Sequence, residues 1–238
     1  MSRWLIAVHG EPFDLEELPR WFPDGEVFAF SEGSSFFLTG SRFDFLINPV
    51  DVLDVATDAL SERCAIVSLL WPGMKQLSVG AVFREQDDGQ RIPNTMVRAE
   101  VGALRIKAGR PSAFQAGTGG GQTDAQRLLV ASRSNRHLEI ALLLWASADK
   151  SWPRLYRLAE ELEAYIGMPV DKVGFCSDPE RVRFTHSANS SAAGIDSRHR
   201  EGRYAPPRTP MAHDEAVAFV RQLIIETLKR ANAEAANP

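Results

Sequence analysis

The spacing of apolar residues changes once along the chain, and this change constrains the fold more than any other feature. Apolar and polar residues alternate over residues 77–83 and again over residues 97–103. Further along, apolar residues recur every three or four positions, as in Leu138, Leu142 and Trp145. A period of two indicates half-buried antiparallel strands, whereas a period near 3.6 indicates amphipathic helices. We therefore predict an α+β fold, with a β-rich N-terminal part and a helical C-terminal part.

Short apolar runs predict the remaining elements of the first half. Residues 4–8 predict a first strand, and residues 27–30 and 36–39 predict a hairpin around a turn with Gly33. Residues 43–47 predict one more strand, and the three prolines between residues 12 and 23 predict an irregular stretch. Asn48 and Pro49 then begin one packed helix, because Asn caps helices and Pro favours the first helical position.

A Gly-rich segment predicts the boundary between two domains. The cluster Gly117-Thr118-Gly119-Gly120-Gly121 precedes a helix, where backbone amides can hold a phosphate. It runs into Gln122-Thr123-Asp124 without the Lys of a P-loop, and Asp124 would repel an anion. We therefore expect a linker rather than a cofactor site. The predicted boundaries are a β-rich domain at 1–108, a linker at 109–122, a helical domain at 123–230 and a frayed tail at 231–238.

The second half predicts three helices and one long polar stretch. The first helix carries an apolar face from Leu128 to Trp145, with Asn135 at a core-like position. Asn135 indicates a buried polar contact, control of the register between helices, or a narrower seam at that point. Ser151 and Gly167 bound a second helix, and the last helix begins near His213. Residues 177–210 form a polar stretch, and residues 181–208 within it predict a charged loop, of the kind that is functional or disordered.

The sequence lacks the strong motifs of catalysis and metal binding. No His-x-x-x-His, Cys/His cluster or Gly-x-Ser-x-Gly occurs, so we predict no metal and no cofactor. Cys64 and Cys176 have no metal-site spacing, and we expect reduced thiols, with Cys64 buried. The formal net charge of -4 argues against a generally basic nucleic-acid-binding protein. Without a run of about 18 apolar residues no membrane span is expected, and we predict a cytoplasmic protein.

Basic side chains gather between residues 181 and 208, with Phe184 and Tyr204 nearby. Guanidinium groups bind phosphate and aromatic rings stack on exposed bases, so this stretch is typical of RNA binding. A solvated surface loop is the alternative. Histidine acts as an acid or base near neutral pH and arginine stabilises phosphorane charge, so Arg181 and His186 are the catalytic candidates. The binding candidates are Arg183, Arg198, His199, Arg200 and Arg203.

Residues 193–230 combine Ser197-Arg198-His199-Arg200-Glu201-Gly202, then Pro206-Pro207 and Pro210-Met211, and a final amphipathic helix that opens with Glu215-Ala216. This part, under a fifth of the chain, resembles small bacterial helical domains of the HEPN superfamily, including those of phage-defence proteins. The resemblance implies RNA binding or metal-independent RNA cleavage by an Arg and a His that lie four to six residues apart. Arg181 and His186 have this spacing, whereas Arg198 and His199 are adjacent and depart from it.

Three functions are compatible with the sequence. The first is a non-catalytic accessory or binding protein of a bacterial system, in particular a defence system, with a protein or a second copy as its partner. The absence of strong catalytic motifs favours it. The second is an RNA-binding protein or ribonuclease of HEPN type. A small-molecule enzyme with a site built from scattered residues is a third. Convergence of Arg181, His186 and the 198–203 residues on one concave surface would favour RNA.

Overall fold

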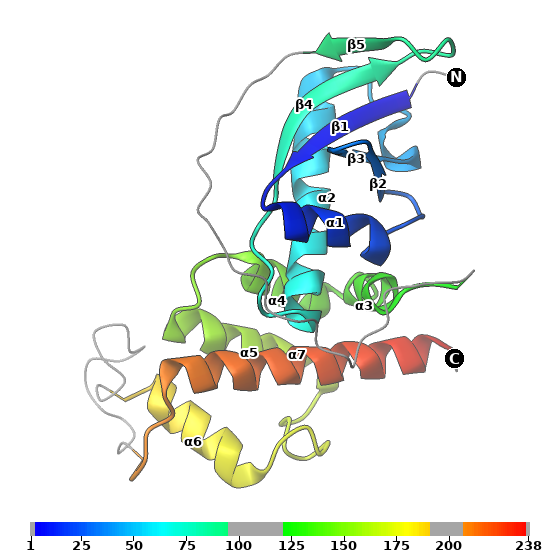
Figure 1. Cartoon of the computed structure of the whole chain (residues 1–238). Coiled ribbons are helices and arrows are strands. Elements are labelled where there is room, and N and C mark those ends of the chain that lie inside the picture. Colours follow the sequence, from blue (N-terminus) through cyan, green and yellow to red (C-terminus); the bar gives the residue numbers. More distant parts are fainter. Residues whose placement is uncertain (1–2, 95–120, 191–206, 237–238) are drawn as a thin grey trace. The chain divides into compact units, whose positions relative to one another are not determined.

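The computed structural model of the chain describes residues 3–94, 121–190 and 207–236 (Figure 1). These residues form a five-stranded antiparallel sheet and seven α-helices, which confirms the predicted α+β class. The chain divides into two compact units, residues 1–127 and residues 128–238. The predicted linker at 109–122 lies almost entirely outside the described residues, and the predicted domain boundaries stay predictions.

The sheet of the first unit has the strand order β2-β3-β1-β4-β5. The strands are β1 (Arg3–His9), β2 (Phe28–Glu32), β3 (Ser35–Thr39), β4 (Ser78–Glu85) and β5 (Arg91–Asn94). The central strand β1 pairs with β3 on one side and with β4 on the other, so that Ile6 lies opposite both Leu38 and Val82. All three side chains are buried, as the alternating apolar pattern requires. The strands predicted at 4–8, 27–30, 36–39 and 77–83 are therefore confirmed.

Helix α2 (Pro49–Leu70) packs against this sheet through β4 and β1 (Figure 1). It begins as predicted, because the side chain of Asn48 accepts a hydrogen bond of 3.0 Å from the backbone N–H of Val50. Its inner face carries the fully buried Arg63. The guanidinium donates to the backbone oxygens of Val27 at 2.6 Å and Ala59 at 2.9 Å. A buried cation on two carbonyls fixes α2 to the segment that leads into β2.

Two predictions for the first unit are wrong. Helix α1 (Pro12–Trp21) replaces the irregular stretch, because Pro12 occupies the first turn, where no backbone donor is needed. Residues 43–47 form no strand: a short 3₁₀ helix, η1 (Ser41–Phe43), is followed by a turn. Phe43 fills the core while the next apolar side chains face solvent, so the run does not present one face to a sheet. The strand predicted at 97–103 lies outside the described residues.

Helices α3 (Asp124–Ser132) and α4 (Arg136–Ala146) replace the single helix predicted across Asn135. Asn135 is the N-cap of α4, and its side chain accepts a hydrogen bond of 2.8 Å from the N–H of His137. The interpretations of Asn135 as a residue on the apolar face of one continuous helix are therefore wrong. Apolar residues keep their spacing of three and four across the break between α3 and α4. The sequence pattern therefore predicts one continuous helix.

The remaining helices belong to the second unit. Helix α5 (Trp152–Ile166) ends at Gly167 as predicted, and it packs against α4, α6 (Asp178–Ala188) and α7 (His213–Ala236). Helix α6 lies within the stretch predicted as a loop, and Ser177 and Glu180 form a capping box at its start. Helix α7 extends to Ala236, past the predicted end at Arg230. No helix in the described part of the chain is long and apolar enough to cross a bilayer.

Candidate functional site

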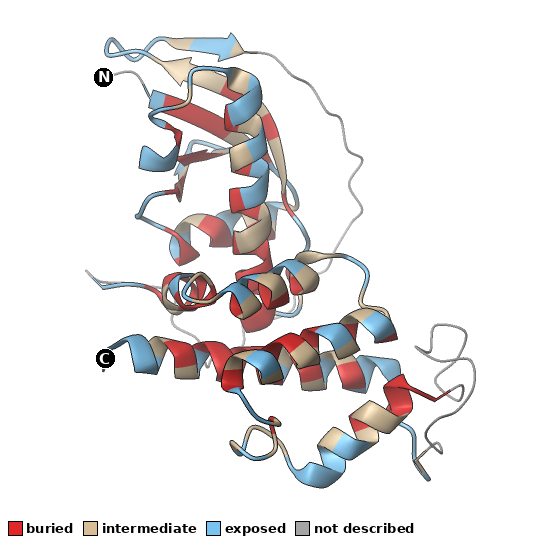
Figure 2. Ribbon diagram, turned by 180° about the vertical axis from the view of Figure 1, so that it is seen from behind, coloured by how far each residue is buried: buried red, intermediate tan, exposed pale blue. Residues whose placement is uncertain are grey.

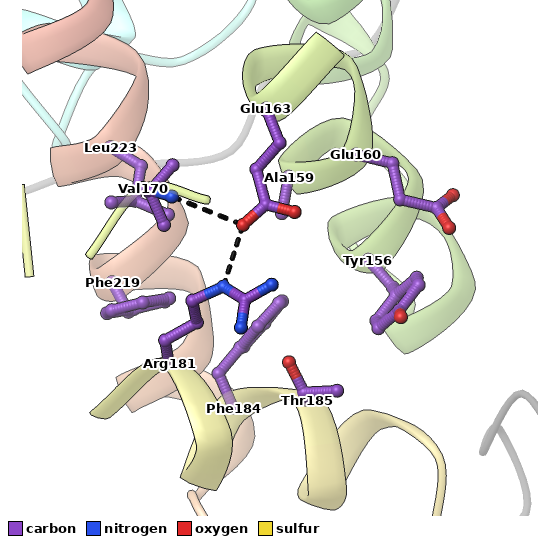
Figure 3. Close-up of a pocket in the computed structure, with 10 residues that line it drawn as sticks. All are labelled: Tyr156, Ala159, Glu160, Glu163, Val170, Arg181, Phe184, Thr185, Phe219 and Leu223. Atoms are coloured by element: carbon purple, nitrogen blue, oxygen red, sulfur yellow. Dashed lines mark hydrogen bonds and ion pairs between the residues drawn. The ribbon is translucent and has the colours of Figure 1, made fainter. Parts of the chain in front are cut away.

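A small pocket lies between α5, α6 and α7 and has a volume of about 60 Å³ (Figure 3). Aromatic rings form one side of it. The centroid of the Phe184 ring is 6.4 Å from that of Tyr156 and 5.1 Å from that of Phe219. Ligand sites for whole small molecules are usually about 300–1,000 Å³, so this pocket has room for a group of only a few atoms. Its polar lining residues are Glu160, Glu163, Arg181 and Thr185.

The predicted catalytic residue Arg181 lines this pocket, but two carboxylates lie close to its Nε. Its Nε donates to Oε1 of Glu163 at 2.7 Å, and the same oxygen accepts from the N–H of Val170 at 3.2 Å (Figure 3). Oδ1 of Asp171 lies 3.4 Å from the same Nε. The hydrogen bond to Glu163 raises the pKa of Arg181 above its ordinary value. A phosphate in this pocket would compete with two internal carboxylates for one guanidinium.

His186 does not join Arg181 in the pocket. The two residues are five positions apart on α6, which places them about 140° apart around the helix axis. His186 is half-buried and is not among the lining residues. The catalytic role of this pair therefore stays a prediction without geometric support.

The predicted binding residue Arg183 holds α6 to the start of α7. Its Nη2 lies 2.8 Å from Oε2 of Glu215, and Nη1 bonds the other oxygen of the same carboxylate. Its Nε also donates to the backbone oxygen of Thr209 at 2.8 Å. A bidentate ion pair of this kind holds α6 and α7 together and leaves few donors of the guanidinium for a ligand. The other binding candidates, Arg198, His199, Arg200 and Arg203, lie outside the described residues.

One positioned histidine occurs elsewhere in the second unit. Nδ1 of His137 lies 2.7 Å from Oε2 of Glu161, a buried carboxylate that also pairs with Arg157 at 2.5 Å. A carboxylate that orients an imidazole is one part of many active sites. Here the pair links α4 to α5, and within the described residues neither side chain bonds a hydroxyl or a thiol. Over the described ranges, no group of three His, Cys, Asp or Glu side chains could hold a metal ion.

Neither cysteine is an activated nucleophile. Both are free thiols; Cys64 is buried, as predicted, and Cys176 is half-buried. Burial raises the pKa of Cys64 to about 11, and burial together with nearby carboxylates raises the pKa of Cys176 to about 11. The thiolate is the reactive form, and at neutral pH these shifts leave almost none of it.

The least expected feature of the surface is a set of exposed apolar side chains before and at the start of α2. Phe45 is 91% exposed, Ile47 is 90% exposed and Val50 is 43% exposed. We call these three residues the 45–50 surface. Their neighbours in sequence, Phe43 and Val52, are fully buried. The exposure is therefore local to one short segment of the first unit.

The backbone beneath the 45–50 surface is held on both sides. Nε1 of Trp4 donates to the backbone oxygen of Leu46 at 2.9 Å, and the N–H of Leu46 donates to the oxygen of Phe43 at 3.0 Å. The Asn48 cap fixes the residues that follow. Phe45 and Ile47 thus project from an anchored backbone, and a partner would order few additional degrees of freedom on binding them.

Acidic residues lie near the 45–50 surface in the sequence. Asp44 precedes Phe45, and Asp51, Asp54 and Asp58 lie along the exposed side of α2, which is blue in Figure 2. Residues 44–62 contain five acidic residues and no basic one. The sequence did not indicate this surface, because residues 43–47 have the apolar character of a strand. Two large apolar residues directly before a helix N-cap were the available indication.

No protein-family model, no curated protein and no solved structure matches this chain.

Proposed function

We propose that the chain is a non-catalytic binding protein that holds a protein partner through the 45–50 surface. The exposure of Phe45 and Ile47 on an anchored backbone carries this proposal. Burying one large apolar side chain contributes about 1.5–3 kcal/mol, and aromatic residues in particular dominate the energetics of interfaces. These two residues can therefore supply much of the affinity of a specific complex.

The other groups of the described chain support the same proposal. The pocket near Arg181 is small, and the charges of Arg181 and Arg183 are balanced by carboxylates. Both cysteines carry free thiols. Reduced cysteines are usual in reducing compartments, and we propose a cytoplasmic location on that basis.

Site-specific crosslinking tests the proposed docking function. We would place a benzophenone amino acid at position 45 in host cells, and at position 88, an exposed site in the β4–β5 turn, as the control. We expect one discrete protein adduct from position 45 and none from position 88. The adduct should disappear when Ile47→Ser is added. Equal adducts from both positions, or an adduct that is insensitive to Ile47→Ser, would contradict the proposal.

The affinity of the captured partner gives the quantitative test. Phe45→Ser with Ile47→Ser removes about 3–6 kcal/mol of apolar burial, so binding should weaken at least about 100-fold. The matched control is Ile92→Ser, which changes another exposed apolar residue of the same unit. This control should bind like the parent protein.

The HEPN-type alternative makes an opposite forecast for single-stranded RNA. Under the proposal, fluorescence anisotropy at about 50 mM salt stays at baseline. Binding that falls steeply by about 200 mM salt and is lost in Arg198→Ala with Arg200→Ala would favour the RNA alternative, because each neutralised phosphate releases counterions.

A further inference from the structure

We infer that the partner presents an apolar pocket rimmed by lysine and arginine. This inference rests on the docking function proposed above and names the chemistry of the partner. Its starting observation is a set of four carboxylates beside the 45–50 surface. Asp44, Asp51, Asp54 and Asp58 are exposed, and none of their side chains makes an ion pair or hydrogen bond within the described part of the chain.

Three of these carboxylates share one face of α2. At about 100° per residue, Asp51, Asp54 and Asp58 fall within an arc of about 60°, and Val50 lies about 40° from Asp54. Val50, the one residue of the 45–50 surface that lies on α2, is therefore a neighbour of Asp54 on the helix surface. A partner that covers Val50 also meets the aspartates.

The fold gains little from this acidic stripe beyond Asp51, which lies in the first turn of α2, where the helix dipole favours a negative charge. Asp51 and Asp54 are three residues apart, and Asp54 and Asp58 are four apart, which are the spacings at which like charges repel on a helix. The cation of α2 itself, Arg63, is buried with its guanidinium on two backbone oxygens. The nearby Arg42 lies 3.8 Å from Glu62 rather than beside the aspartates. Cations supplied by a partner would relieve the repulsion.

Charge also decides against the other occupants of this surface. Nucleic acids and anionic lipid surfaces carry the same sign of charge as the stripe and are repelled. A second copy bound through a two-fold axis would bring the same patch onto itself, and so aspartates against aspartates. A protein with a basic rim satisfies both the apolar and the acidic parts.

A displayed library of random peptides is the probe. We would select binders to the full chain and discard those that still bind the Phe45→Ser, Ile47→Ser variant. We expect the retained peptides to combine apolar residues with a net positive charge. Their binding should weaken as NaCl rises from about 50 to about 500 mM, because salt screens exposed charge pairs.

Neutral variants measure the contribution of the stripe. Each exposed ion pair changes affinity by about 1.4- to 5-fold, so Asp51→Asn, Asp54→Asn and Asp58→Asn together should weaken binding roughly 3- to 150-fold at low salt. The difference should close at high salt. Glu16→Gln with Glu139→Gln, which neutralises exposed carboxylates on α1 and α4, is the control and should leave binding unchanged. The triple variant removes repulsion, and circular dichroism should show an intact fold.

The outcomes separate this inference from the function on which it rests. If no peptide depends on Phe45 and Ile47, the docking function itself is overturned. If dependent peptides are neutral or acidic, or if the triple variant binds like the parent at low salt, the docking function stands and the basic rim is wrong.

Discussion

Thr123 offers the sharpest test of how the first unit holds its last segment. This buried residue is the N-cap of α3: its Oγ1 donates to the backbone oxygen of Trp21 at 2.5 Å and accepts from the N–H of Gln126 at 3.1 Å. Oε1 of Gln126 accepts in return from the N–H of Thr123 at 2.7 Å. Nε2 of Gln126 then donates to Oδ1 of Asp24 at 2.6 Å. One capping box therefore joins the start of α3 to the end of α1.

Thr123→Val keeps the shape of the side chain and removes its hydroxyl. Loss of the cap costs about 1 kcal/mol, and a buried carbonyl at Trp21 without its donor costs about 1–3 kcal/mol. The free energy of unfolding should therefore fall by roughly 2–4 kcal/mol. Thr123→Ser keeps the hydroxyl and loses one buried methyl group, which costs about 0.8 kcal/mol.

Hydrogen exchange by mass spectrometry, with urea unfolding of the full chain, measures both changes. Peptides that cover residues 12–27 and 121–132 should lose protection in Thr123→Val and keep most of it in Thr123→Ser. If the two variants are destabilised equally, or if Thr123→Val lies within about 0.5 kcal/mol of the parent, the capping box does not fix this segment.

Three further predictions follow from single residues. Gly40→Ala should lower the free energy of unfolding by about 2 kcal/mol or more in a urea titration, because φ is +140° and a Cβ would lie 2.2 Å from the oxygen of Glu26. Gly33→Ala, with open space around the position, should cost less. Burial raises the pKa of Cys64 to about 11, so the thiol ionises at a lower pH in the unfolded chain than in the folded one. The free energy of unfolding should therefore fall as pH rises from about 9 to 11, and Cys64→Ala should flatten this slope. An unchanged slope would refute the raised pKa of Cys64. Asn135→Ala should cost about 1 kcal/mol through loss of the α4 cap, and Asn135→Asp should restore most of it in thermal unfolding.

Local patterns in the sequence were sufficient for most of the first unit. The alternation around Val82 and the apolar run of β1 predict strands because one face of each is buried in a sheet. Asn48 and Pro49 predict the start of α2 because both act through the backbone of the next few residues. Signals that are complete within five or six residues survive in the tertiary structure.

The missed elements lack such a signal or hide it. Helix α6 buries only Phe184, Ser187 and Ala188, so it has no apolar stripe, and the only signs of it in the sequence are at its start: the capping box of Ser177 and Glu180, Asp178 and a Pro in the first turn. At Asn135 the period continues unbroken, and a side-chain cap does not alter periodicity. Helix α6 and the break between α3 and α4 are marked by capping hydrogen bonds. The spacing of apolar residues does not reveal such bonds.

The candidate sites were less predictable than the fold because they depend on contacts between distant segments. Arg181 was singled out from the sequence, but the carboxylates that balance its charge come from α5 and the loop after it. Phe45 and Ile47 follow the buried Phe43 with the same spacing as a strand face, and only the tertiary structure shows which of them face solvent. Whether a side chain is buried depends on the residues that pack against it in the fold, and local sequence patterns do not identify those residues.

The place of β1 in the sheet sets the order in which the chain can complete its fold during synthesis. Strands β2 and β3 form one local hairpin, and β4 and β5 form another, so each pair can close as soon as it leaves the ribosome. In the described sheet, the two hairpins are joined through β1, whose second neighbour ends at Glu85. The first strand to be made therefore has one edge uncovered until residues 78–85 have been made. Until then a nascent chain carries an open, apolar strand edge, the kind of surface that chaperones shield.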